Sequence, residues 1–395
     1  MPFIPLSVPN IKGNEIKYVT KVLEEEWVST AGQCINDFED LIAKYVKADY
    51  ACACQSGTAG LHLCLRTFGI EQNDIVLVPT LTFIATINSI MYQKAQPVFF
   101  DCDENLCMDV NQIEKYLKED CTFDGKTVVD KTLNKQVKAI VPVHIFGAVT
   151  NMEKIMELSR KYNLYVIEDA TESLGTEYTD GCYTGKFSGT IADAGVFSFN
   201  GNKIITTGGG GMVVSNNKEI IDRVRYLSTQ AKDDMVYFIH NEVGYNYRMT
   251  NLQAALGIAQ LEQLDKFIET KKQNYDYYVN KFQGDELAYI LPFSSGIRPN
   301  YWFYSMVLKK PDADLRDKII AYFNENGIQT RPIWKLNHTQ KPFEKFKCMS
   351  IDKAKIYYDS IINLPCSSNL TKEDIDTIFN CYNKFKQEEL GNGYN

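Results

Sequence analysis

The residues best suited to chemistry lie in the stretch FSFNGNKIITTGGGGM. In it one lysine, Lys203, precedes four consecutive glycines, Gly208–Gly211. In a nucleotide-binding P-loop the lysine follows the glycines and opens a helix. Here the residues after the glycines, MVVSN, are β-branched and typical of a strand. The order therefore argues against an ATP site. Two alternatives remain for Lys203: it takes part in covalent chemistry, or it lies in solvent beside a glycine turn.

Three other groups that could serve the same site lie where predicted strands end. Ser56-Gly57-Thr58 precedes a helix, where free backbone N–H groups can seat a phosphate, although simple N-capping explains these residues as well. Asp169 directly follows a hydrophobic strand, where a carboxylate needs a cationic partner unless it caps the next helix. Phe83 could stack on a flat ring or pack in the core.

These groups together suit one cofactor, pyridoxal 5′-phosphate (PLP). PLP requires a lysine for its Schiff base, an acid beside its ring nitrogen, a phosphate cradle and a ring-stacking group. Ser198 could add a hydroxyl to the cradle, and the glycines after Lys203 would let the backbone pass close to the cofactor. No single group is specific, so the hypothesis depends on their order and spacing along a chain of alternating strands and helices.

The elements that would position these residues follow an α/β pattern. Helices are predicted at Thr58–Phe68 and Met152–Tyr162, and buried strands within Asn73–Phe83, Pro97–Asp103, Val137–Gly147, Leu164–Ala170, Ala194–Phe199 and Gly211–Asn216. Near-continuous apolar strands alternating with helices indicate a mainly parallel sheet covered on both faces. The polar, turn-rich segment Cys121–Gln136 is predicted to be a surface β-excursion.

The pattern changes near Ala259. From there the sequence predicts a long helix at Leu261–Phe282, a strand at Tyr301–Leu308, and helices at Asp314–Gly327 and Lys372–Phe385. We therefore expect an N-terminal segment of residues 1–30, a large PLP-binding domain of residues 31–258 and a smaller α+β domain of residues 259–395. The tail Gly391–Asn395 is expected to be frayed.

Composition excludes several classes of function. The chain has 42 basic and 50 acidic residues, and this balance argues against general binding of nucleic acid or anionic membranes. The 11 cysteines are scattered, with Cys52 and Cys54 the only close pair, so we expect reduced, mostly buried thiols in a cytoplasmic protein without a metal site. No signal peptide is evident, and no run approaches the roughly 20 apolar residues of a membrane span.

The sequence also resembles the DegT/DnrJ/StrS sugar-nucleotide aminotransferases, over nearly its whole length. The motifs SGTAGLHL, IEDATESLG, FSFNGNKIITTGGGGM, GYNYRMTNLQAALG and RPIWKLNHTQKPF carry the resemblance. It implies a fold-type I PLP-dependent aminotransferase, with a mainly parallel seven-stranded sheet in the large domain. The LegC and PglE type is most similar, which implies transfer from L-glutamate to C4 of UDP-4-keto-6-deoxy-N-acetylglucosamine, for legionaminic acid or bacillosamine synthesis.

The resemblance also implies a role for individual residues. Lys203 is the catalytic residue, which links to PLP and then carries the proton. Asp169 pairs with the ring nitrogen, Phe83 stacks on the ring, and Glu172 lies near the 3′-oxygen. The implied phosphate contacts are Gly57, Thr58, Ser198 and, from the second subunit of a homodimer with shared active sites, Asn246.

Three departures from the commoner family pattern all agree with the LegC and PglE type. Asn200 stands where many relatives have His, Gly209 where many have Glu, and Glu172 where many have Gln or His. Related dehydratases replace the lysine with His, so Lys203 favours transamination. A sugar dehydratase, an aminotransferase for a GDP- or TDP-linked keto sugar, and a non-catalytic PLP-binding regulator remain as alternatives.

Two further segments are candidates for the nucleotide-sugar substrate. Trp27, Ser29 and Thr30 stand at a family position near the sugar pocket, and a helix end followed by a turn explains them equally well. A cation and an aromatic could hold a pyrophosphate and a uracil ring, which gives the candidates Arg331, Trp334, Lys335 and His338, with plain surface positions as the alternative. The remaining histidines are expected to be structural (His62 and His144) or are unassigned (His240).

Overall fold

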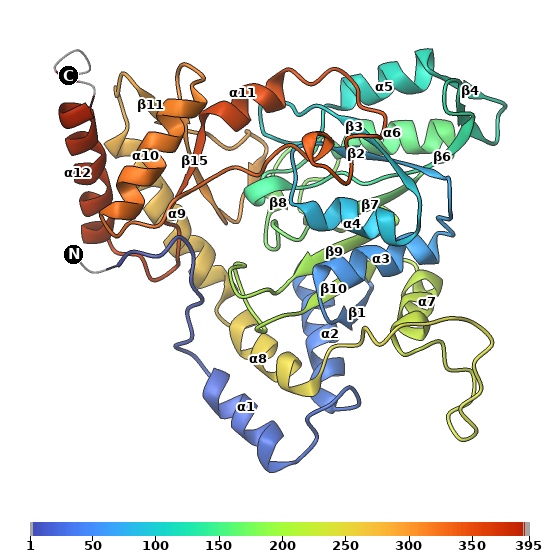
Figure 1. The fold of residues 1–395 in the computed structure, drawn as a ribbon. Coiled ribbons are helices and arrows are strands. Elements are labelled where there is room, and N and C mark those ends of the chain that lie inside the picture. Colours follow the sequence, from blue (N-terminus) through green and yellow to red (C-terminus); the bar gives the residue numbers. More distant parts are fainter. Residues whose placement is uncertain (1–2, 390, 392–395) are drawn as a thin grey trace.

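The strands predicted from the sequence assemble into one central sheet in the computed structural model, which describes residues 3–389 and 391 (Figure 1). The main path of the sheet has seven strands in the order β1 (Tyr50–Cys54), β10 (Gly211–Ser215), β9 (Ala194–Ser198), β7 (Tyr165–Asp169), β6 (Lys135–Ile140), β2 (Ile75–Pro79) and β3 (Gln96–Phe100). The five strands from β9 to β3 are parallel to one another, which confirms the mainly parallel sheet.

The other two strands on the path, β10 and β1, are antiparallel to their neighbours. The chain passes from β9 to β10 through the segment that carries Lys203, and this segment contains no helix. Without a helical crossover the second strand returns antiparallel to the first. β1 was not predicted from the sequence, because its residues YACAC lack the β-branched side chains by which the other strands are recognised.

Helices cover both faces of this sheet. One face packs on α3 (Gly57–Thr67), α4 (Ile84–Tyr92) and α7 (Lys218–Ser228), and the other on α2 (Gln33–Val46), α5 (Val110–Glu119) and α6 (Met152–Tyr162). The predicted β-excursion is confirmed as a hairpin of β4 (Cys121–Phe123) and β5 (Val128–Asp130) beside β6.

A second, antiparallel sheet follows in the C-terminal part of the chain. Its order is β11 (Ala288–Ile290), β13 (Tyr304–Leu308), β15 (Ile361–Leu364) and β14 (Arg331–Pro332). It packs with the helices α9 (Leu264–Lys281), α10 (Ala313–Glu325), α11 (Lys353–Ser360) and α12 (Lys372–Glu389). Short elements complete the fold, namely α1 (Glu15–Glu24), α8 (Asn251–Leu261), and the paired strands β8 (Glu177–Tyr178) and β12 (Ile297–Arg298).

Two predicted elements of this part begin later than expected. The strand predicted from Tyr301 starts at Tyr304, because Tyr301 adopts a left-handed backbone conformation with φ +54°. The helix predicted from Leu261 starts at Leu264, because α8 occupies the chain up to Leu261. The domain boundaries at residues 30 and 258 stay predictions, and the predicted frayed tail lies, except for Gly391, outside the described residues.

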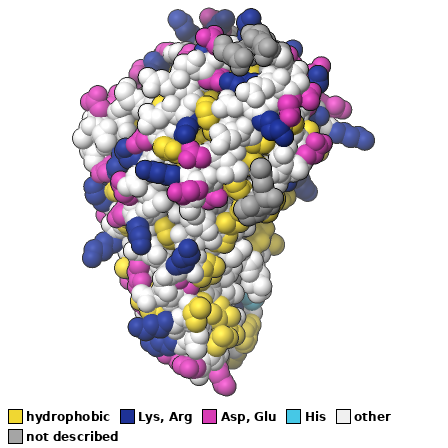
Figure 2. Space-filling view, turned by 90° about the vertical axis from the view of Figure 1, so that its left-hand side faces the viewer, with side chains coloured by type: hydrophobic (Ala, Val, Ile, Leu, Met, Phe, Trp, Pro, Cys, Tyr) yellow, Lys and Arg dark blue, Asp and Glu magenta, His cyan; other side chains and the backbone are white. Residues whose placement is uncertain are grey.

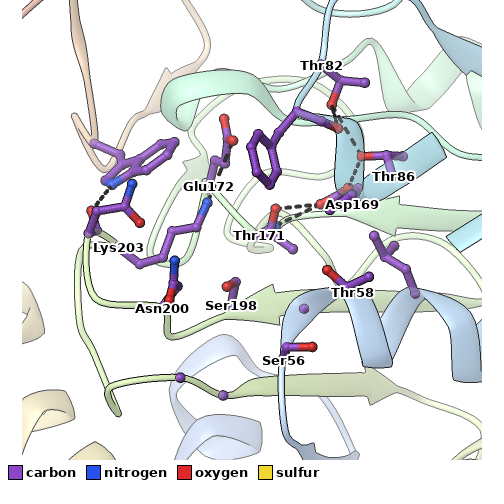
Figure 3. A pocket seen from close by; sticks show the side chains of 18 of the residues that line it. Ser56, Thr58, Thr82, Thr86, Asp169, Thr171, Glu172, Ser198, Asn200 and Lys203 are labelled. Carbon is purple, nitrogen blue, oxygen red and sulfur yellow. Dashed lines mark hydrogen bonds and ion pairs between the residues drawn. The ribbon is translucent and has the colours of Figure 1, made fainter. Parts of the chain in front are cut away.

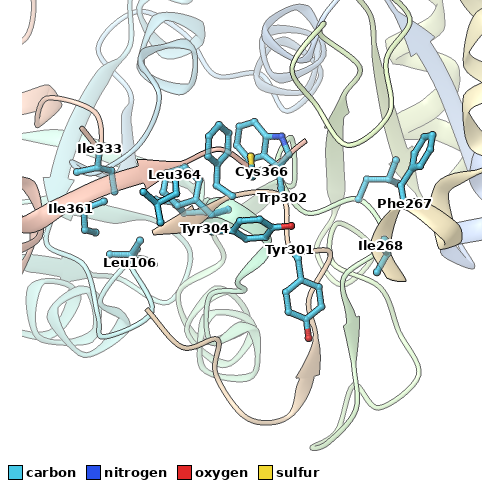
Figure 4. Close-up of a cluster of buried hydrophobic side chains, with 14 of the residues drawn as sticks. Leu106, Phe267, Ile268, Tyr301, Trp302, Tyr304, Ile333, Ile361, Leu364 and Cys366 are labelled. Atoms are coloured by element: carbon cyan, nitrogen blue, oxygen red, sulfur yellow. The ribbon is translucent and has the colours of Figure 1, made fainter. Parts of the chain in front are cut away.

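The two sheets share one hydrophobic core. Side chains from β1 and α2 belong to the same buried cluster as side chains from β13 and β15, and Figure 4 shows the region around Tyr304, Ile361 and Leu364. The shared core fixes the second sheet against the edge where β7 and β9 end.

All 11 cysteines are free and eight of them are buried, as predicted. No described helix combines the length and the apolar character that crossing a bilayer requires.

Candidate active site

A cavity of about 330 Å³ opens at the edge where β7 and β9 end and α3 begins (Figure 3). Parallel α/β sheets bind ligands at this edge, because the carboxyl ends of their strands meet there. The residues lining the cavity include Gly57, Thr58, Phe83, Asp169, Glu172, Ser198 and Lys203. Seven of the eight residues predicted for the cofactor are thus brought together, whereas Asn246 does not line the cavity of its own chain.

The N-terminus of α3 forms one wall of the cavity. Ser56 is the N-cap of this helix, and its hydroxyl accepts a hydrogen bond from the backbone N–H of Ala59 at 3.0 Å, so the capping interpretation is confirmed for Ser56. The first N–H groups of a helix have no partner within it, which leaves those of Gly57 and Thr58 for an anion. A Cβ on Gly57 would lie 2.8 Å from Thr171 Cγ2, so only glycine fits this position.

Asp169 lines the same cavity at the carboxyl end of β7. It is 2% exposed and accepts hydrogen bonds from Thr86 Oγ1 at 2.7 Å, from Thr171 Oγ1 at 2.7 Å and from the Thr171 backbone N–H at 3.2 Å. The chain turns after Asp169 instead of entering a helix, so the helix-cap interpretation is wrong. Neutral donors stabilise a buried carboxylate without neutralising it, and a cation in the cavity would complete its environment.

Lys203 extends into the cavity toward Glu172, with Nζ 3.7 Å from Oε1 (Figure 3). The other oxygen of Glu172 accepts a hydrogen bond from the backbone N–H of Phe146 at 3.0 Å. Burial lowers the pKa of Lys203, although the charges of Glu172 and Asp169 partly oppose this effect. Burial also raises the pKa of Glu172, to about 7. Lys203 is therefore closer to a neutral, nucleophilic amine than an exposed lysine is.

The raised pKa of Glu172 predicts a pH dependence of folding stability in the cofactor-free protein. Glu172 keeps its proton in the folded state between its ordinary pKa of 4.5 and about 7, whereas the unfolded chain loses it. Its contribution is fully present below pH 4.5 and is lost as the pH rises to 7. Between pH 5 and 7, the free energy of unfolding should fall in wild type by on the order of 2 kcal/mol more than in Glu172→Gln.

Urea unfolding at both pH values measures this difference. Glu153→Gln is the matched control, since Glu153 is an exposed carboxylate at the start of α6. Equal pH dependence in wild type and Glu172→Gln would show that Glu172 is ionised throughout this range.

Phe83 is not a core residue. Its side chain is 51% exposed on the cavity wall, 6.2 Å from the ring of Trp334. The strand before it ends at Pro79, and Phe83 is instead the N-cap residue of α4. The core interpretation is therefore wrong, and an exposed aromatic face remains available to a flat ligand.

The predicted substrate residues fall into two groups. Trp334 lines the cavity, whereas Arg331 and Lys335 are exposed and outside its lining. His338 is half-buried, with Nδ1 2.7 Å from Thr80 Oγ1. His338 is therefore hydrogen-bonded within the protein. Of the four residues, only Trp334 lines the cavity.

The N-terminal candidates lie farther away. Trp27, Ser29 and Thr30 occupy the loop between α1 and α2 and do not line the cavity of this chain. Trp27 is 62% exposed, and the carbonyls of Trp27 and Ser29 accept hydrogen bonds from Asn251. Asn246 is exposed as well. Substrate or cofactor roles for these four residues stay predictions.

None of the four histidines lines the cavity, and the two that were expected to be structural are buried. His144 is fully buried, with Nε2 2.8 Å from Glu168, which confirms the core assignment. His62 is buried in α3, in edge contact with Tyr92 and Tyr245. His240 contacts the carbonyl of Gln230 in a loop.

Several residues that line the cavity were not anticipated from the sequence, among them Thr86 and Thr171 beside Asp169 and, next to Lys203, Trp302. The ring of Trp302 lies over Lys203, with Nζ 4.0 Å from the ring centroid. Its sequence context, NYWFYSMVL, has the apolar composition of a buried strand, so nothing local separates Trp302 from a core residue. Only the tertiary contact between the two parts of the chain reveals it.

The residues of the cavity fit PLP. The amine of Lys203, the buried carboxylate of Asp169 and the N-terminus of α3, which has no side chain at Gly57, could hold its aldehyde, ring nitrogen and phosphate. The exposed ring of Phe83 borders the same space. Each functional group of the cofactor thus has a chemically matched partner.

Comparisons with known proteins agree with this fit. The sequence model of the DegT/DnrJ/EryC1/StrS aminotransferase family matches residues 9–383. The chain is 37% identical to a GDP-perosamine synthase of Escherichia coli O157:H7 over 98% of its own length and 100% of that protein's. It is 29% identical to a UDP-4-amino-4,6-dideoxy-N-acetyl-beta-L-altrosamine transaminase of Campylobacter jejuni, covering 98% of the chain and 100% of that protein. A DegT DnrJ EryC1 StrS aminotransferase from Brucella abortus superposes with a TM-score of 0.85 at 25% identity, covering 94% and 95% of the two chains.

Proposed function

The chain belongs to the DegT/DnrJ/EryC1/StrS aminotransferase family, and we propose that this PLP-dependent enzyme moves the amino group of L-glutamate to C4 of a nucleotide-linked 4-keto-6-deoxy sugar. The observation that carries the proposal is a single cavity lined by Lys203, Asp169 and the N-terminus of α3, in which the amine of Lys203 lies 3.7 Å from Glu172. A lysine in this position favours amino-group transfer over the dehydration carried out by relatives that lack it.

Each side chain has a distinct task in this proposal. Bound PLP supplies an aldehyde and an electron-accepting ring. Lys203 would provide the amine that holds the aldehyde, and its free amine would remove and return the proton of the substrate. Asp169 holds the ring nitrogen protonated, while the N–H groups of Gly57 and Thr58 and the hydroxyl of Ser198 hold the phosphate. One site serves both substrates in turn, so the kinetics should be ping-pong.

Two nucleotide sugars are the leading substrates. The transaminase from Campylobacter jejuni supports a UDP-linked N-acetylated sugar, and we favour UDP-4-keto-6-deoxy-N-acetylglucosamine for legionaminic acid or bacillosamine-type glycans. The GDP-perosamine synthase, at 37% identity, supports a GDP-linked keto sugar at least as strongly. The half-buried indole of Trp334 on the cavity wall suits a nucleotide base or a sugar face in either case.

Assays of the purified enzyme with L-glutamate and UDP-, GDP- or TDP-linked 4-keto-6-deoxy sugars separate these possibilities. Oxoglutarate should form only with an acceptor sugar, and the nucleotide with the highest kcat/KM identifies the substrate class. If the protein binds PLP but none of the reactions forms oxoglutarate, the proposal is contradicted and a regulatory role is favoured.

A homodimer with shared active sites is part of the proposal. Figure 2 shows hydrophobic side chains gathered on the lower, narrower part of one face, where α1 lies. The exposed apolar residues of this region include Ile16 (79% exposed) and Leu23 (54%). A second copy of the chain would cover them, and Asn246 would then be available to the partner's phosphate site.

A cytoplasmic location stays a prediction from the reduced cysteines.

Gly57→Ala should weaken PLP binding by about 10-fold, because its Cβ would lie 2.8 Å from Thr171 Cγ2 and 3.1 Å from Ser198 Cβ and would force the phosphate seat apart. Absorbance titration of the cofactor-free protein with PLP measures the change in Kd. Gly201→Ala is the matched control, since a Cβ on Gly201 meets no atom within 4 Å. Equal affinities of the two variants would place the phosphate elsewhere.

A further inference from the structure

The amine of Lys203 is held between two side chains that come from different parts of the fold. Glu172, in the turns after β7, has Oε1 3.7 Å from Nζ, and Trp302, just before β13, has its ring centroid 4.0 Å from Nζ. An aromatic face at this distance attracts an ammonium group through its ring quadrupole. Lys203 therefore has a cation-binding partner that its own sheet does not provide.

The ring of Trp302 is fixed in place by its own hydrogen bonds. Its indole Nε1 donates to the carbonyl of Asn202 at 2.8 Å, and Asn202 directly precedes Lys203. Trp302 is only 3% exposed and packs edge-on against Phe303, with ring centroids 4.4 Å apart. The aromatic face is thus tied to the backbone of the lysine that it covers.

The fully buried Asn300 links Trp302 to Glu172. Its side-chain carbonyl accepts a hydrogen bond from the Trp302 backbone N–H at 3.0 Å. Its amide group donates to the carbonyls of Glu172 and Leu174, both at 3.0 Å. One buried side chain therefore sets the spacing between the two residues that hold the amine.

Backbone strain is located at the same place. Tyr301, between Asn300 and Trp302, has φ +54°, and Phe146, whose N–H binds the carboxylate of Glu172, has φ +57°. Aromatic residues seldom adopt this left-handed conformation, and such outliers persist where the surrounding structure enforces them, often at functional sites. Tyr301 and Trp302 both belong to the buried cluster of Figure 4.

We propose that Trp302 is a positioning residue for Lys203: its ring holds the amine beside Glu172 whenever that amine is not attached to the cofactor, and Asn300 keeps the two holding groups in register. This inference rests on the proposed function and adds a residue to it. In transamination the lysine is released in every half-reaction and must still reach the proton of the substrate. A freed lysine side chain without such a contact would sample many rotamers.

The decisive experiment compares Trp302→Phe with Trp302→Leu in cofactor-free protein. Both variants keep an apolar side chain over the amine, and Glu172 and Asp169, the charged groups that face Lys203, are unchanged. The pH dependence of labelling by trace acetic anhydride, read by mass spectrometry, gives the pKa of Lys203, with the exposed Lys355 as internal reference. Loss of the aromatic face should lower the pKa of Lys203 in Trp302→Leu by about half a unit or more relative to Trp302→Phe.

Equal pKa values of Lys203 in the two variants would overturn the inference. Trp302→Met provides a second non-aromatic variant should Trp302→Leu fail to fold, with near-ultraviolet circular dichroism as the check on folding. The labelling uses neither PLP nor a sugar. It can therefore succeed even if no keto sugar is turned over, and it can fail even if the proposed function is correct.

Kinetics of the loaded enzyme provide the second readout. Trp302→Leu should lower kcat about 10-fold with little change in KM, and Trp302→Phe should recover most of that loss. A rise in KM at unchanged kcat would instead make Trp302 a substrate contact and overturn the positioning role.

Discussion

Lys203→Ala is expected to lower transamination by about 10,000-fold, because it removes both the amine that attaches to the cofactor and the base that moves the proton of the substrate. The cavity offers no equivalent group, since Lys203 is the only lysine that lines it in the described part of the chain. The measurement is oxoglutarate formation in a single turnover. Borohydride reduction of wild type loaded with PLP should attach the cofactor to residue 203, and the same treatment of Lys203→Ala should leave no adduct there.

Two further variants distinguish the loss of the nucleophilic amine from the loss of its positive charge and from general damage to the protein. Lys203→Arg keeps a cation near Glu172 but stays protonated, because a guanidinium does not lose its proton in proteins, and it should be as inactive as Lys203→Ala. Lys355→Ala removes an exposed lysine and should behave as wild type. If Lys203→Ala kept more than a small fraction of activity, or if the adduct formed on another lysine, the cavity would not be the site of amino-group transfer.

The sequence was sufficient to predict the residues that lie in short, ordered motifs at strand ends. Asp169 and Ser198 end β7 and β9, and Gly57 opens α3, so a correct sheet order is enough to bring them together. Glu172 follows Asp169 by three residues and falls beside Lys203 for the same reason. These positions depend on local geometry and on the direction of parallel strands, both of which a hydrophobic pattern reveals.

The residues that the sequence could not supply depend on contacts between distant segments. Trp302 reaches the cavity from the segment before β13, about a hundred residues after Lys203. The buried Asn300 holds it there through a left-handed turn at Tyr301 that no periodicity predicts. Phe83 was ambiguous because an aromatic after a buried strand is usually core, and its exposure follows from the early end of β2 at Pro79. Local propensity cannot decide such cases, because tertiary packing overrides it.

The second large effect is expected at Asp169, where replacement by asparagine should lower kcat/KM by about 100- to 1,000-fold. The shape of the side chain is kept. The Thr171 backbone N–H and hydroxyl can still donate to the asparagine oxygen, and the hydroxyl of Thr86 can turn to accept from its amide. Only the negative charge is lost, and under the proposed function a protonated ring nitrogen of the cofactor would then lack its partner and accept electrons less readily.

Thr86→Val is the matched variant that retains this charge. It removes one of the hydrogen bonds to Asp169 but leaves the carboxylate in place, so the loss of activity should be only about 10-fold. Both variants should still take up PLP on Lys203, which absorbance and borohydride reduction verify before any rate is compared. A loss in Asp169→Asn no larger than in Thr86→Val would mean that the hydrogen-bonded shape of the site, and not the buried charge, supports the reaction. In that case the carboxylate could not be the partner of the ring nitrogen.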